Sequence, residues 1–187
     1  MPPFNHFTTK AKEVIRKSHE LAIERGQNHV NPVHLLAALI MQEESMVASI
    51  LDKLEVDIML LIDSVSEAIE GQDGGSTLSP SYQMYLTPEL ANAIENSVKI
   101  AANLKDEFVS TEHLFLALFD APGNVKEILA RFRIDKQSIL NILEKLKNSN
   151  ITDVNLPKKF KFLIKYARSL TKLAAENKLD PVIGRDS

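Results

Sequence analysis

Histidines are the side chains of this sequence best suited to metal binding or to proton transfer near neutral pH. The chain has five of them, and none has the spacing to a second ligand that a zinc site requires. It has no cysteine, which excludes disulfides, thiolate metal ligands and a thiol nucleophile. The sequence motifs of phosphate loops, zinc proteases and serine hydrolases are also absent. The sequence therefore predicts no catalytic residue, no metal site and no enzymatic activity for this chain.

A group of carboxylates, Asp106, Glu107 and Glu112, lies just before and at the start of an expected helix. A general acid/base pair is disfavoured, because no nucleophile accompanies these residues. A structural role is open, since acidic side chains near a helix N-terminus interact favourably with its dipole. Recognition of basic side chains on a bound polypeptide is a third interpretation.

An internal repeat organises the chain that must position these groups. Residues 7–40 match residues 86–119 at an offset of 79, and the match resumes at an offset of 78 after a one-residue slip. We expect one repeat over residues 7–71 and a second over residues 86–148. The identical pairs are Thr8/Thr87, Ile15/Ile94, Ser18/Ser97, Ala22/Ala101, Val30/Val109, His34/His113, Leu35/Leu114, Ala38/Ala117, Leu39/Leu118, Val47/Val125, Ile50/Ile128, Leu51/Leu129 and Asp57/Asp135.

Each repeat has the pattern of four helices, so the predicted fold class is all-α: two tandem four-helix repeats. Threonine or asparagine caps, often followed by proline, mark helix starts, and Gly26 marks the end of the first helix. We expect helices to begin at Thr8 or Thr9, Asn31, Thr87 and Ser110, and to span residues 46–54, 57–70, 123–132 and 135–147. The four residues expected to face inward from the second helix are Leu35, Leu36, Leu39 and Ile40.

Two of the histidines, His34 and His113, occupy equivalent positions in the two repeats. They could form a metal or proton-switch pair, or each could bind the backbone near the start of its own helix. We favour the second interpretation, because duplication of a scaffold explains a duplicated position.

Apolar side chains follow a flexible Gly- and Ser-rich connector between the repeats, and they include Tyr82, Tyr85 and Leu86. They either seal the contact between the repeats or line an apolar groove that binds another chain. Beyond the second repeat we expect a linker at residues 149–158 and a further amphipathic helix within residues 159–187, where the net charge is +4.

Composition limits the partners. The net charge of −3 argues against nucleic-acid binding, and the longest apolar run, Leu35–Met41, is too short to cross a membrane. The N-terminus lacks the pattern of a secretion signal, so we expect a cytoplasmic location.

Several segments resemble the Clp N-terminal repeat domain of AAA+ unfoldases. They are Phe7-Thr-Thr-Lys-Ala11, Asn31-Pro-Val-His-Leu-Leu-Ala-Ala-Leu39 and Val109-Ser-Thr-Glu-His-Leu-Phe-Leu-Ala-Leu118. Residues 165–185 resemble the entry to the first ATPase module of these proteins, which predicts that residues 159–187 are its truncated start. The linker Ile151-Thr-Asp-Val-Asn155 is similar to that of ClpB-type disaggregases.

The resemblance implies a function for the parent protein. It would be a hexameric ring that uses ATP and Mg²⁺ to thread aggregated polypeptides, together with the DnaK chaperone system. This piece, expected to be monomeric and without a cofactor, would engage unfolded or aggregated client chains through an apolar groove between the repeats. The family's client-binding positions carry over to Thr8, Asp106 and Glu112. Val182 and Ile183 match part of its adenine pocket.

Other functions stay open. A ClpC- or ClpA-type domain would instead dock an adaptor protein for a protease. Members that read phosphorylated arginine resemble this chain only in part, because Val33 replaces one of the two required glutamates. A stand-alone interaction protein is a further alternative.

Overall fold

The computed structural model describes residues 6–71 and 85–148, and these form eight α-helices with two very short strands. The predicted all-α fold is confirmed. The predictions for residues 149–187, including the linker and the last helix, fall outside the described residues. The first-half elements are α1 (Thr9–Glu24), β1 (His29–Val30), α2 (Pro32–Met41), α3 (Met46–Lys53) and α4 (Ile58–Glu70). The second-half elements are β2 (Tyr85–Leu86), α5 (Pro88–Asn103), α6 (Thr111–Ala117) with the 3-10 turn η2 (Leu118–Asp120), α7 (Asn124–Arg131) and α8 (Lys136–Asn148).

The helix bounds follow the sequence repeat. Adding 79 to the bounds of α1 gives those of α5, and adding 78 to those of α3 gives those of α7. The predicted caps are present. The Thr8 and Thr87 side chains accept hydrogen bonds from the first turns of α1 and α5, and Gly26 has a φ of +69° after α1.

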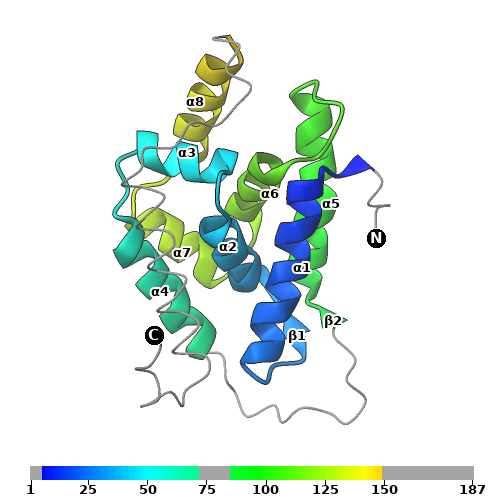
Figure 1. Cartoon of the computed structure of the whole chain (residues 1–187), viewed down its shortest axis with the longest axis vertical. Helices are drawn as coiled ribbons and strands as arrows, with labels where there is room; N and C mark the ends of the chain where they lie inside the picture. The colour runs from blue at the N-terminus through cyan, green and yellow to red at the C-terminus, as the bar shows by residue number, and fades with distance from the viewer. Residues whose placement is uncertain (1–5, 72–84, 149–187) are drawn as a thin grey trace, which may run out of the picture.

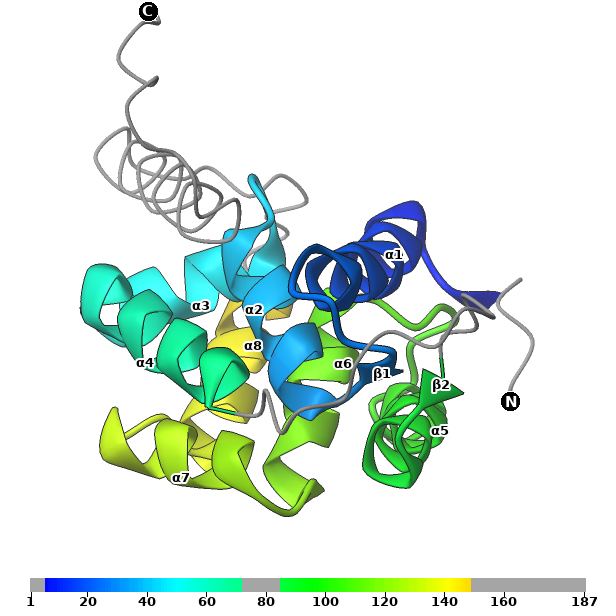
Figure 2. The same ribbon diagram turned by 90° about the horizontal axis from the view of Figure 1, so that it is seen from below.

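The core is built around α2 and α6. Both helices lie between α1 and α5 on one side and α3, α4 and α7 on the other (Figures 1 and 2). All ten residues of α2 are buried, rather than only the four inward-facing residues expected from the sequence. A helix that neighbours cover from every side is apolar all round and has no solvent face.

Two matching backbone contacts join the repeats. β1 pairs with β2 in parallel, with Val30 opposite Leu86, while Phe7 forms a parallel bridge with Val109. Phe7 and Leu86 are equivalent in the repeat, as are Val30 and Val109. Each repeat therefore contributes its first residues to the other, as expected for a pseudo-two-fold relation between them.

Within the described residues, no single helix is long and apolar enough to cross a membrane. The pair α2 and α3 satisfies the length and composition test only jointly, across an 83° bend.

Candidate functional site

The start of α1 is held against the segment that leads into α6. The Thr8 Oγ1 accepts a hydrogen bond from the Ala11 N–H at 3.1 Å, which caps α1. The Thr8 N–H donates to the Val109 carbonyl at 2.9 Å. Two of the three predicted client-binding positions, Asp106 and Glu112, flank Val109 in sequence. The fold thus brings Thr8, Asp106 and Glu112 to one junction between the repeats.

Asp106 has a structural partner at this junction. The His113 Nδ1 accepts the Ser110 N–H at 2.8 Å, so in the neutral ring the proton is on Nε2. That nitrogen lies 2.7 Å from the Asp106 Oδ2 and donates to it. The Asp106 carboxylate therefore orients His113, which closes the capping box of α6. Asp106 remains about a quarter exposed, with a side-chain exposure of 25%.

His34 makes the equivalent contacts in the first repeat. Its Nδ1 accepts the Asn31 N–H at 3.0 Å, and its Nε2 lies 2.6 Å from the Gln27 Oε1. Burial lowers the pKa of His34 to about 4, with smaller contributions from Arg25 and His19. Both histidines bind the backbone of their own helix start, as predicted. The described part of the chain contains no cluster of metal-binding side chains.

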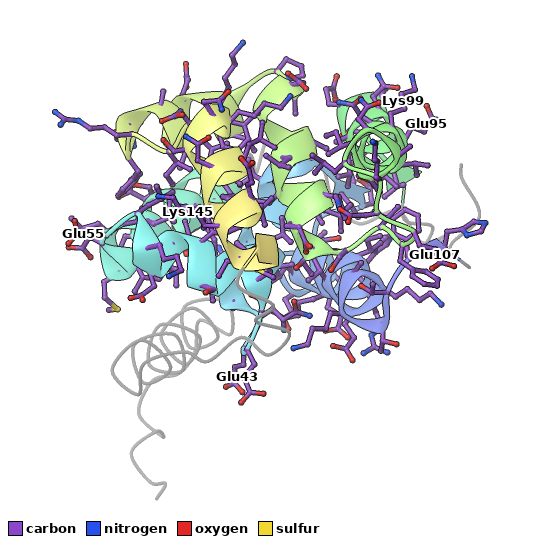
Figure 3. All side chains as sticks on the ribbon, turned by 90° about the horizontal axis from the view of Figure 1, so that it is seen from above. Glu43, Glu55, Glu95, Lys99, Glu107 and Lys145 are labelled. Atoms are coloured by element: carbon purple, nitrogen blue, oxygen red, sulfur yellow. The ribbon has the colours of Figure 1, made fainter. Side chains whose placement is uncertain are left out.

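The remaining carboxylates of the group differ in environment. Glu112 lies on the first turn of α6 and is half-buried, and its Oε1 is buried without a hydrogen-bond partner in the described structure. Glu107 is exposed and lies on the side of the molecule formed by α1 and α5 (Figure 3). The equivalent of Glu112 in the first repeat is Val33, which is buried. The polar character of this junction is therefore not duplicated.

The other predicted site residues are placed only in part. Leu86 is half-buried and packs against the core. Tyr85 is placed by its backbone in β2, opposite His29. Tyr82, Val182 and Ile183 lie outside the described residues.

Two cavities lie beside α5, and their described lining residues differ from those expected to line an apolar groove between the repeats. The first, which we name the seam cavity, has a volume of about 430 Å³ and lies where the starts of α2, α5 and α7 meet. The second, the α5 cavity, has a volume of about 400 Å³ and lies between α5 and η2. The sequence repeat does show one difference at this place, because Glu89 of α5 corresponds to Lys10 of the first repeat. The seam cavity is lined by Asn31, Pro32, Val33, Thr87, Glu89, Pro122, Gly123, Asn124 and Val125.

The whole-chain comparisons agree with this architecture. A family model, described as the Clp repeat (R) N-terminal domain, matches residues 6–132. The chain belongs to the Clp repeat N-terminal domain family. The match covers every helix except α8, including both junctions between the repeats.

Relatives of this Clp repeat domain include the chaperone protein ClpB of Clostridium tetani. It is 31% identical over 186 residues, covering 96% of this chain and 21% of the relative. The chain therefore spans about a fifth of the length of the curated relatives that it matches, and it corresponds to their N-terminal Clp repeat region.

Solved structures show the same fold. The Hsp104 N-terminal domain from Candida albicans superposes with a TM-score of 0.66 at 17% identity, covering 81% of this chain and 96% of that one. A ClpV N-domain, solved as a complex with a VipB peptide, superposes with a TM-score of 0.59 at 18% identity, covering 73% of this chain and 83% of that one.

Proposed function

We propose that this domain binds unfolded or aggregated polypeptides for an ATP-dependent disaggregase of the ClpB type. The support is its membership of the Clp repeat family, together with relatives named as ClpB chaperones. A neighbour of the same fold, the ClpV N-domain, is known in complex with a peptide. The parent would be a cytoplasmic hexameric ring that works with the DnaK system. Its ATP and Mg²⁺ would bind in an ATPase module, of which residues 159–187 would be the start and Val182 and Ile183 the first adenine contacts.

The observation that carries this proposal is the unsatisfied oxygen of Glu112. A buried acceptor without a partner costs free energy, and a rotation of the half-buried side chain that brings this oxygen to an N–H of a bound chain would remove that cost. The start of α1, with Thr8, lies against the same junction. Glu112 would accept a backbone N–H or a lysine or arginine of the client, while Asp106 would act as a positioning residue through His113.

Binding by one domain would be weak. An unfolded client loses chain entropy when it is ordered, which reduces its affinity for each unit of buried surface. Several domains around one ring would raise the effective concentration of sites and so restore useful affinity. This arrangement suits a domain that must release its client to the threading pore.

The proposal can be tested with fluorescently labelled, unfolded casein and the 187-residue chain. We expect weak binding by fluorescence anisotropy, and about threefold to tenfold weaker binding after Glu112→Gln, which removes one charge-assisted hydrogen bond. Glu55→Gln, the same change at an exposed position away from the junction, is the matched control and should leave binding unchanged. Absence of casein binding by the unmodified chain would refute the proposed function.

An adaptor-docking function, as in ClpC- or ClpA-type proteins, is the second candidate. A neighbour of the same fold is the N-terminal domain of ClpD from Arabidopsis thaliana, a chaperone described as associated with a caseinolytic protease, which superposes with a TM-score of 0.58 at 21% identity. Stoichiometric binding of a folded adaptor, with no binding of casein, would favour it.

A further inference from the structure

The two cavities beside α5 adjoin. Glu89 and Pro122 line both the seam cavity and the α5 cavity, so the two cavities are neighbours that meet at these two residues. Together they form one trough, which we name the α5 trough. It runs from the start of α2, past the start of α7, and along α5 and η2.

We propose that the α5 trough is a second polypeptide-binding site, which takes an extended segment with an apolar residue flanked by lysine or arginine. This inference rests on the proposed function, because it names a class of client segment and a place where it binds. The site is distinct from the Thr8–Glu112 junction, which lies at the other, pseudo-equivalent contact between the repeats.

The chemistry of the trough fits such a segment. At the seam end, the apolar side chains of Pro32, Val33 and Val125 form its floor, and all three are buried in the fold. Along α5 the floor consists of small residues, Ala93 and Ala117. Because these floor residues are buried, the apolar surface that they expose is small and matches one apolar side chain rather than a long apolar segment.

The walls of the trough are acidic. Their charged residues are Glu89, Glu95 and Asp120, opposed by the single lysine Lys99. Glu95 and Lys99 extend from one stretch of α5 into solvent (Figure 3). Asp120 already contacts the Lys136 Nζ at 3.3 Å, whereas Glu89 is half-buried and has neither an ion pair nor a hydrogen bond within the described structure. Glu89 therefore gives the junction of the two cavities an uncompensated negative charge, which complements a basic client residue.

The first repeat has the same architecture, but the Lys10 side chain bridges the place that corresponds to Glu89 and Pro122, beside the Thr8–Glu112 junction. Its counterpart of the α5 cavity is a smaller cavity of about 240 Å³ between α1 and α2. The equivalents of Glu89 and Pro122 are Lys10 and Glu43, and these are bonded to each other. The Lys10 Nζ donates to the carbonyl oxygens of Glu43 at 3.4 Å and Glu44 at 2.6 Å.

We name these hydrogen bonds of the Lys10 side chain the Lys10 latch. A further hydrogen bond to the Lys10 backbone supports it. The Gln42 Nε2 donates to the Lys10 carbonyl at 3.0 Å. The second repeat can form neither bond, because Glu89 cannot donate and Ala121 replaces Gln42. The two repeats have thus diverged at this position. The first repeat has the hydrogen-bonded Lys10, and the second has the acidic Glu89 without such a bond.

Replacing Glu89 with lysine, the residue at the corresponding position of the first repeat, tests the proposal. The probes are fluorescein-labelled dodecapeptides, one with alternating leucine and lysine and one with glutamate in place of lysine, titrated against the 187-residue chain. Glu89→Lys should build a latch to the carbonyl groups of Pro122 and Gly123, and it also reverses the charge. We expect binding of the leucine–lysine peptide to weaken by about fivefold or more, and by about twofold in Glu89→Gln, as exposed charge contacts are individually modest. The leucine–glutamate peptide should bind more weakly than the leucine–lysine peptide to the unmodified chain, and this difference should be smaller in Glu89→Lys.

The matched control is Glu55→Lys, the same charge change at an exposed site across the molecule from Glu95 and Lys99 (Figure 3). It should leave peptide binding unchanged, and circular dichroism should show equal helix content in all variants. Equal affinities of the unmodified chain and Glu89→Lys would overturn the trough proposal, while the Glu112→Gln result on casein would still decide the proposed function independently. If Glu55→Lys weakens binding as much as Glu89→Lys, net charge alone explains the effect and the trough proposal is likewise overturned.

Discussion

At the residue scale, His34 links stability to pH. Its pKa is about 4 in the folded chain, against an ordinary value of 6.5, because burial disfavours the charged ring. As pH falls below 6.5, the unfolded state therefore takes up a proton that the folded state does not, so stability is lost between pH 6.5 and 4. We expect His34 to account for a loss on the order of 2 kcal/mol between pH 7 and 5.

Urea unfolding at both pH values measures this loss. In His34→Gln the free energy of unfolding at pH 7 should be lower, because a buried capping contact is lost, but its decrease from pH 7 to 5 should be smaller than in the unmodified chain. Leu60→Ala, an exposed change without a titrating group, should keep the full decrease. An unchanged decrease in His34→Gln would contradict the assignment.

A pair of equivalent residues tests the cost of left-handed backbone. Gly26 and Lys105 follow α1 and α5, with φ values of +69° and +61°. A side chain in this conformation costs roughly 1 kcal/mol, which glycine avoids. Lys105→Gly should therefore raise the free energy of unfolding by about that amount. Gly26→Ala should lower it similarly, since an added Cβ there meets nothing within 4 Å and only the backbone is strained. Changes of the same sign in both variants would disprove this explanation.

At the element scale, α2 supplies a stability prediction. Leu39 in α2 is fully buried, and Leu39→Ala should destabilise the fold by about 2–5 kcal/mol through lost burial and a residual cavity. Leu60 in α4 has 55% of its surface exposed, so Leu60→Ala should change stability by less than about 0.5 kcal/mol. Chemical denaturation of both variants measures the difference. Similar losses would mean that α2 is not the central element of the core.

The same elements show what the sequence could predict. Caps such as Thr8 and the repeat itself gave the helix starts, because these signals are local in the chain. The full burial of α2 depends on neighbours from both repeats, and no local period contains that information. The repeat shows that Glu89 replaces Lys10, but Glu89 and Pro122 are 33 positions apart, and only the fold shows that they meet at the α5 trough. Asp106 was predicted as a client contact, and its bond to His113 could be found only in the structure.

At the scale of the whole molecule, the two repeats should unfold together. Each repeat contributes its first residues to a backbone pairing in the other, through Phe7 with Val109 and Leu86 with Val30. The buried residues of both also form one hydrophobic cluster. A repeat that unfolded alone would expose its partner's core face and break both pairings, so we expect a single cooperative transition.

The chain has no tryptophan, so amide NMR signals are the suitable probe. In a urea titration, amides of α1 and α5 should have the same midpoint, and Leu39→Ala should lower both midpoints equally although Leu39 lies in the first repeat. Separate midpoints, or a shift confined to α1, would show that the repeats are independent units joined by a connector.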